Sequence, residues 1–371
     1  MKTTKVDQGH PQLDTRSSLL LPLLARHPRT VILTCFFLSG ATGLVYEVVW
    51  SRRLTLIFGA TVLAVSTVLA VFLGGLAVGS LIFGRIADRR RDPFLMYALL
   101  EGGVGLACLA TPWLFIAVEQ SYTYLHPYLA ENVWLVRLLR FALSAIVLFV
   151  PTALMGGTLP VLSRAVVSTL PEVGAKVAWL YGINTLGAVV GAVSAGFLLI
   201  PSLGISFTIY TAALVNLGIA VIALALHVAQ ADHPITHPPE PAVPPLSPDA
   251  RRAYQGLLLA YGASGAAALI YEVGWTRVLS LAFGTTTYAF SSMLGAFLLG
   301  IGLGSLVLAS PRVIRLDRLR APLLWFGVLE VAIAACVTFL TPLLDRLPLT
   351  FLTLFRYTGP RFWALQAAEA A

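Results

Sequence analysis

Residues Ser39–Leu81 read SGATGLVYEVVWSRRLTLIFGATVLAVSTVLAVFLGGLAVGSL, and residues Ser264–Leu306 read SGAAALIYEVGWTRVLSLAFGTTTYAFSSMLGAFLLGIGLGSL. About half of the aligned positions are identical, at one constant offset and without a gap. Both copies are mostly apolar, yet each keeps a Tyr-Glu pair followed by Trp and Arg. Because internal repeats of apolar segments build many transporter folds, this repeat predicts a membrane protein made of two related halves.

The composition also favours a membrane protein. Hydrophobic residues make up 58% of the 371 residues and charged residues 11%, against about 45–50% and about 25% in an average soluble domain. A soluble core cannot enclose so much apolar surface, whereas a bilayer can. The net charge of +8 comes from basic residues in short loops between apolar runs. That pattern is typical of the positive-inside rule and does not predict a nucleic-acid partner.

Apolar segments of about 20 residues, the length that crosses the hydrocarbon core of a bilayer, follow one another along the chain. We expect an all-α integral membrane protein, a polytopic helical bundle of about nine transmembrane helices. Six spans separate the two copies of the repeat, so it is a parallel repeat like that of the major facilitator fold. The expected spans are 31–50, 61–84, 94–117, 138–160, 179–200, 205–228, 256–275, 285–309 and 322–343.

The spans and the composition between them divide the chain into five segments. The linker between the halves contains AQADHPITHPPEPAVPPLSPDA, in which the proline density forbids a helix. The second half ends before it repeats the fourth span, so we expect it to be incomplete and the chain to be truncated. The segments are a basic tail (1–30), a first membrane half (31–228), a proline-rich linker (229–255), an incomplete second half (256–345) and a C-terminal segment (346–371).

The distribution of basic residues predicts the orientation. The N-terminal tail and the loops after the second and eighth spans are rich in Lys and Arg, whereas the stretch 118–135 has none. Dense basic loops stay on the cytoplasmic side. We therefore expect a multi-pass protein of the inner (plasma) membrane with a cytoplasmic N-terminus.

No pattern in the chain predicts a metal or a cofactor. The three cysteines lie inside apolar runs without a CxxC spacing, and the histidines near the linker have no cysteine partners. Free cysteines of this kind are commonly buried packing residues. We expect no metal, no cofactor and no catalytic residue in this chain.

Two carboxylates occupy the same position in the two copies of the repeat, Glu47 and Glu272. A charged residue in a spanning helix costs about 2.5–3.5 kcal/mol on insertion scales, so such a residue is a candidate functional group. One hypothesis is that the halves bring the two carboxylates together to bind a cation or a proton. A cationic solute with two charges would then contact the neighbouring Tyr46 and Tyr271.

An alternative hypothesis makes the same motif an interfacial anchor. The glutamates lie near the expected outer ends of their spans, with Trp50 and Trp275 at the level of the headgroups. Each glutamate would then form an ion pair with the arginine that follows it, Arg52 or Arg277.

A second repeated pair, Glu101 and Glu330, lies in LLEGGVGLACLATP and VLEVAIAACVTFLTP. Both are expected to open their spans on the cytoplasmic side, where the helix dipole stabilises a carboxylate. Between the second and third spans, the basic segment GRIADRRRDP holds Asp88, which is available to cap a helix or to pair with an arginine.

Two further segments predict unusual helices. In PTALMGGTLP, Pro151 and Pro160 flank a Gly-Gly pair, so we expect the fourth helix to break there. In NTLGAVVGAVSAG, Gly187 and Gly191 form a small-residue face for close helix contact. Asn184 at the start of that segment is either a site residue or a hydrogen-bonding contact between helices.

Several of these motifs together resemble one family. The repeated SGxxxLxYEVxWxRxLxLxFG, the FLxGxxxGS that follows, PTALMGGTLP with LPVLSR, and WLYGINTLGAVVGAVSAGFLLIPSLG are similar to the fused major-facilitator/spermidine-synthase-like proteins of bacteria. The resemblance covers about residues 31 to 345. It implies a multi-span membrane region followed by a cytoplasmic aminopropyltransferase-like domain.

The chain departs from that family where the enzyme domain is expected. It contains no GGGDG-type loop after a strand and no βαβ alternation. No catalytic residue of a synthase can therefore be assigned in this chain.

Three functional hypotheses follow from the sequence. The chain transports or handles a small, polyamine-like cationic solute, it is a fragment of a membrane-bound polyamine aminopropyltransferase, or it is a scaffold without a substrate. The expected partners are the lipid bilayer, the cationic solute, and either a second copy or a separate synthase domain.

Overall fold

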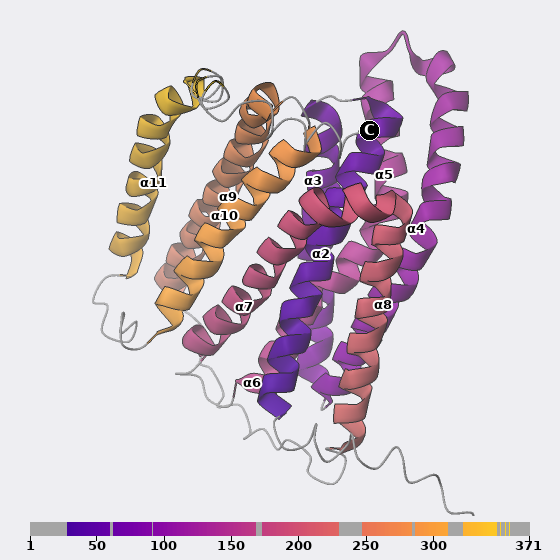
Figure 1. Ribbon diagram of the computed structural model, residues 1–371. Coiled ribbons are helices and arrows are strands. Elements are labelled where there is room, and N and C mark those ends of the chain that lie inside the picture. Colours follow the sequence, from indigo (N-terminus) through magenta and orange to yellow (C-terminus); the bar gives the residue numbers. More distant parts are fainter. Residues whose placement is uncertain are drawn as a thin grey trace, which may run out of the picture.

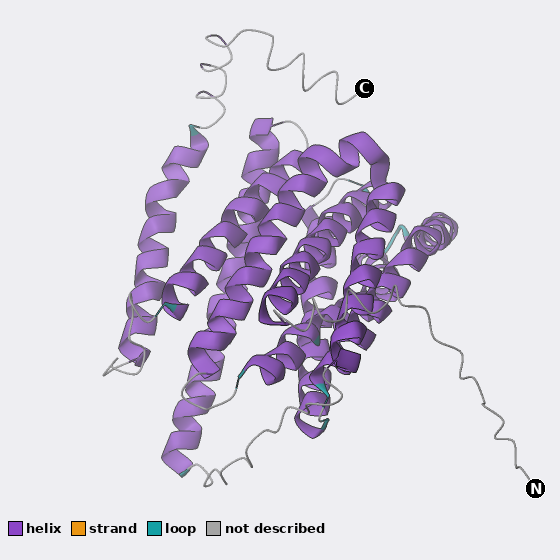
Figure 2. Cartoon of the chain, turned by 60° about the horizontal axis from the view of Figure 1, so that its bottom comes forward, coloured by secondary structure: helices purple, strands orange, loops and turns teal. Residues whose placement is uncertain are grey.

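The computed structural model describes residues 28–59, 62–90, 92–167, 173–229, 247–283, 286–310 and 322–346, with three isolated residues beyond them. Within these ranges every regular element is a helix (Figure 2). Most of the predicted tail, linker and C-terminal segment lies outside the described residues. The helices are α2 (Pro28–Phe58), α3 (Val62–Arg89), α4 (Pro93–Leu129), α5 (Val133–Gly156), α6 (Thr158–Val166), α7 (Val173–Ser194), the short π-helix η2 (Ala195–Leu199), α8 (Ile200–Ala229), α9 (Pro248–Phe283), α10 (Thr286–Ala309) and α11 (Pro322–Asp345).

Eight helical segments among the described residues are long and apolar enough to cross a membrane. The sequence predicts about nine, and the difference lies in the single segment Val173–Ala229, where the expected spans 179–200 and 205–228 form one continuous run. That run is kinked at Gly204. The kink lies inside α8, near its start, and Figure 1 shows α7 and α8 as two legs of the chain joined at one end. The protein is a polytopic helical membrane protein.

Six helices form the main bundle, and they pack in three pairs. α2 packs against α7, α3 against α5, and α4 against α8. α10 packs along the other side of α7, and α9 packs on α10 and touches α3. Figures 1 and 2 both place α11 at the edge of the molecule, beyond α9. The larger of the two buried clusters combines residues of α2, α3, α4, α5, α8 and α10.

Small residues allow the closest of these contacts. A Cβ on Gly187 or Gly191 of α7 would collide with the backbone carbonyl of Phe37 or Ala41 in α2. On the other side of the bundle, a Cβ on Gly79 of α3 would collide with the backbone of α5. Close backbone approach between small residues is the usual way in which membrane helices associate.

The starts of α4 and α5 follow local capping rules. Asp92 accepts a hydrogen bond from the backbone N–H of Leu95 at 3.0 Å, and Pro93 begins α4. Asn132 accepts from the backbone N–H groups of Trp134 and Leu135 at the start of α5. Asp and Asn are favoured at this position because their side chains satisfy the free N–H groups of the first turn. α5 therefore begins before its expected span of 138–160. α4 begins close to the start of its expected span of 94–117 and continues beyond the end of it, to Leu129.

Gly204 has φ 74° and ψ 174°, a backbone conformation that is essentially restricted to glycine. A Cβ at this position would meet no atom within 4 Å, so the restriction is conformational rather than steric. We expect Gly204→Ala to lower the free energy of unfolding by about 1–3 kcal/mol. Chemical unfolding in mixed detergent micelles measures this change in the free energy of unfolding. Gly218→Ala, on the same helix at an open position, is the control and should be neutral or stabilising.

Candidate functional site

Glu47 in α2 and Glu272 in α9 are brought together by the fold. Their carboxylates lie close enough to interact electrostatically, and each residue is 5% exposed. At about 1.5 Å per residue, each lies about 16 Å from the C-terminal end of its helix. The two acidic groups are thus buried and lie well inside their helices, one in each copy of the repeated sequence.

Two polar groups without hydrogen-bond partners lie one helical turn from the acidic residues. Trp50 and Thr276 follow Glu47 and Glu272 by one helical turn, and therefore lie on the same helix faces. The indole nitrogen of Trp50 and the hydroxyl of Thr276 are buried without a hydrogen-bond partner in the described structure. Among the described residues, neither carboxylate has an ion-pair or hydrogen-bond partner. Buried polar atoms are normally satisfied, so this face has unused capacity to bind a polar ligand.

The interfacial-anchor hypothesis fits these positions less well. α2 continues to Phe58, beyond the predicted end of its span, and Trp50 is 0% exposed, so its ring packs inside the protein and does not face lipid. No ion pair joins Glu47 to Arg52, or Glu272 to Arg277, in the part of the chain that the structure describes. Instead, Arg53 pairs with Glu119 of α4 at 3.1 Å.

Glu101 lies in a second polar cluster, at the contact of α2, α4 and α8. Its Oε1 accepts a hydrogen bond from Ser39 Oγ at 2.6 Å, and its Oε2 accepts from Asn216 Nδ2 at 2.7 Å. Asn216 Oδ1 accepts in turn from the hydroxyl of Tyr46 at 2.8 Å. Tyr46, which the sequence groups with Glu47 as a ligand contact, therefore uses its hydroxyl inside this cluster.

The second copy of the repeat has corresponding contacts. Ser264 Oγ donates to Glu330 Oε1 at 2.6 Å, as Ser39 does to Glu101. Tyr271 stacks on Trp275 with ring centroids 5.6 Å apart, and Tyr46 stacks on Trp50 at 5.3 Å, both with a 16° angle between the planes.

The helix-dipole interpretation of Glu101 and Glu330 does not match their positions. α4 begins at Pro93 and α11 at Pro322, so each glutamate lies more than two turns inside its helix. The dipole effect is confined to the first turn. In α4 the residue that caps the helix is Asp92.

The remaining predicted residues have structural contacts. Asn184 donates from Nδ2 to the carbonyl of Phe36 at 2.9 Å, a contact between α7 and α2. Pro151 lies inside α5, and Pro160 lies in α6, with Gly157 separating the two helices. Asp88 contacts Arg164 through its backbone carbonyl, which accepts a hydrogen bond at 3.3 Å.

Two residues of the Glu101 cluster were not singled out from the sequence. Asn216 is an isolated amide in the apolar run TAALVNLGIAVIALAL, and Ser39 is the first residue of the repeat. The position of an amide in the middle of a spanning segment is a signal that could have indicated Asn216, because a polar group at this depth needs a partner.

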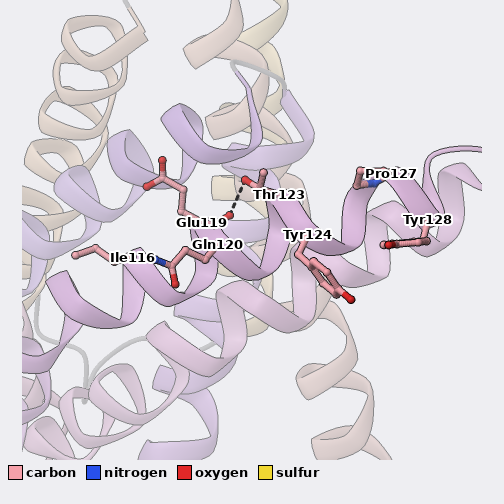
Figure 3. A pocket seen from close by; sticks show the side chains of 7 residues that line it. All are labelled: Ile116, Glu119, Gln120, Thr123, Tyr124, Pro127 and Tyr128. Atoms are coloured by element: carbon pink, nitrogen blue, oxygen red, sulfur yellow. Dashed lines mark hydrogen bonds between the residues drawn. The ribbon is translucent and has the colours of Figure 1, made fainter.

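A hollow on the surface lies elsewhere, on one face of α4 near its C-terminal end (Figure 3). Its lining residues recur at helical spacing, and none of them is a predicted site residue. Figure 3 shows the hydrogen bond from Thr123 Oγ1 to the Glu119 carbonyl, which is internal to the helix. The residues that line it are Ile116, Glu119, Gln120, Thr123, Tyr124, Pro127 and Tyr128.

Comparison with known proteins finds distant, partial similarity to polyamine aminopropyltransferases. The chain is 28% identical over 222 residues to the polyamine aminopropyltransferase of Mycobacterium tuberculosis, which covers 56% of this chain and 38% of that protein. It is 26% identical over 180 residues to polyamine aminopropyltransferase 1 of Streptomyces coelicolor, 48% of this chain and 30% of that protein. The chain thus matches well under half the length of these relatives. No family model and no solved structure matches the chain.

Proposed function

We propose that this protein binds a small, polyamine-like cationic solute between Glu47 and Glu272 and moves or delivers it within the membrane. The observation that carries this proposal is the buried pair of carboxylates without a cationic partner among the described residues. Two ionised carboxylates that interact in a desolvated interior repel each other, and a ligand with two ammonium groups would relieve the repulsion at both.

The proposed architecture is that of a major-facilitator-like protein with a parallel repeat. Support comes from the repeated sequence and from the matching Ser–Glu and Tyr–Trp contacts in both copies. In such folds the substrate site lies near the midplane, where the repeats meet. By the positive-inside rule, we place the protein in the inner membrane with its N-terminus in the cytoplasm.

The similarity to polyamine aminopropyltransferases supports a second proposal, that the chain corresponds to the membrane region of such a protein. The solute site would then serve an aminopropyltransferase domain. A scaffold without a solute is the remaining alternative.

Uptake of radiolabelled spermidine into liposomes that contain the purified chain tests the proposal. We expect Glu47→Gln/Glu272→Gln to reduce uptake at least tenfold, since one charge pair is worth about 1.4 kcal/mol or more at a desolvated site. Glu131→Gln is the control, because it neutralises an exposed carboxylate between α4 and α5, outside the site, and should leave uptake unchanged.

Two results would contradict transport. One is equal uptake by the double variant and the unmodified chain, and the other is no uptake by the unmodified chain. In the second case, spermidine-dependent quenching of tryptophan fluorescence distinguishes a binding protein, which would respond, from a scaffold, which would not.

A further inference from the structure

The repeated Ser–Glu contact lies in two different surroundings. In the first copy, Ser39 donates to Glu101 Oε1, and in the second, Ser264 donates to Glu330 Oε1, both at 2.6 Å. Glu101 and Glu330 also occupy the same place in their helices, since α4 begins at Pro93 and α11 at Pro322. The two contacts can therefore be compared atom by atom.

α8 completes the contact in the first copy. It packs along α4 and also touches α2, and its Asn216 donates to the second carboxylate oxygen of Glu101. With α8 in place, Glu101 is 0% exposed. Two donors from two helices thus satisfy this buried carboxylate.

No described helix takes that place in the second copy. Among the described residues, Glu330 receives a hydrogen bond from Ser264 alone. No residue is buried in the most apolar 18-residue stretch of α11, whereas half of the residues are buried in the corresponding stretch of α4. Lipid chains cannot donate a hydrogen bond. In a bilayer alone, Oε2 of this carboxylate would therefore have no donor, which is energetically unfavourable in a spanning helix.

The exposed face of α11 carries Glu330 between small and aliphatic residues. Gly327, Glu330, Val331 and Ala334 recur at helical spacing and so lie on one face. They correspond to Ala98, Glu101, Gly102 and Gly105 of α4, where the two glycines face Ala220 and Leu217 of α8. A Cβ on Gly327 would meet no atom within 4 Å, so this face is open.

We propose that the face of α9 and α11 around Glu330 is a docking surface for a further transmembrane helix that resembles α8. This helix presents a side-chain amide that donates to Glu330 Oε2, as Asn216 donates to Glu101. Its other contacts are small and aliphatic side chains against the face formed by Gly327 and Ala334. A second copy of the chain and lipid are the competing occupants.

The probe for this surface is a peptide of residues 205–229, the straight part of α8, with an acceptor fluorophore. The donor is attached to Cys336 of the full chain in detergent micelles, because this cysteine is exposed whereas Cys35 and Cys108 are buried. We expect saturable energy transfer, with binding weakened roughly three- to tenfold for a peptide carrying Asn216→Leu, the effect of one interhelical hydrogen bond. Glu330→Leu in the full chain should weaken the unmodified peptide equally, and combining both changes should cause no further loss.

Three results overturn the proposal. The first is no transfer beyond that of a scrambled peptide, and the second is equal binding of both peptides. The third is transfer between donor-labelled and acceptor-labelled copies of the chain that the peptide does not displace, which would assign the surface to a second copy.

Discussion

Replacing Glu101 with leucine is expected to lower the free energy of unfolding by about 2–5 kcal/mol, because each buried donor left without an acceptor costs about 1–3 kcal/mol. Leucine removes the acceptor of both Ser39 Oγ and Asn216 Nδ2. Asn216 cannot turn to a new partner without losing the hydrogen bond from Tyr46. Replacing a whole polar cluster with apolar residues can leave the stability unchanged. Removing only its central member leaves the other polar groups buried without partners.

Glu101→Gln separates the hydrogen bonds from the charge. The amide oxygen can accept from Asn216, and the amide nitrogen can donate to the hydroxyl of Ser39, which also accepts. We therefore expect the glutamine variant to keep most of the stability that leucine loses. Equal losses for both variants would show that the negative charge, rather than the hydrogen bonding, holds the helices together.

A thiol-reactive dye added during unfolding in sodium dodecyl sulfate measures this stability, since Cys35 and Cys108 are buried in the fold. The matched control is Glu330→Leu, which removes the same type of hydrogen bond at a partly exposed position. Its effect on the 371-residue chain should be much smaller. A loss as large as that of Glu101→Leu would contradict the role assigned to α8.

The spans, and the equivalence of Glu47 and Glu272, could be predicted because hydropathy and an internal repeat can be recognised without knowledge of tertiary contacts. Hydropathy identifies a spanning segment from about 20 neighbouring residues, and the repeat places Glu47 and Glu272 at equivalent positions without knowledge of their neighbours. The Glu101 cluster could not be predicted in this way. Its members are separated by up to 170 residues along the chain, and no local pattern specifies which amide meets which carboxylate.

The ends of the helices also could not be predicted from local sequence patterns. The predicted first span stops at Trp50 because Arg52 and Arg53 follow, yet α2 continues to Phe58. Arg53 is accommodated there by its ion pair with Glu119 of α4. A charge that tertiary contact neutralises need not end a helix, and hydropathy alone cannot detect the contact.

Substitution of the α7 glycines should have the other large effect on stability. A Cβ on Gly191 would collide with the carbonyl of Ala41, and one on Gly187 with that of Phe37. Backbone cannot rotate away as a side chain can, so α7 must move off α2, which also weakens the bond from Asn184 to Phe36. We expect a loss of about 1–3 kcal/mol for each Gly→Ala change, and more for the pair.

The control for the glycine substitutions lies on α2 itself. A Cβ on Gly43 would meet no atom within 4 Å, and alanine is the better helix former by about 1 kcal/mol. Gly43→Ala should therefore leave the protein as stable as before or slightly more stable in the same dye assay. Because α7 also carries α10 on its other side, displacement of α7 moves the second half relative to the first. We accordingly expect Gly187→Ala/Gly191→Ala to weaken spermidine uptake as well, and full uptake by a destabilised double variant would show that the Glu47–Glu272 site does not depend on this packing.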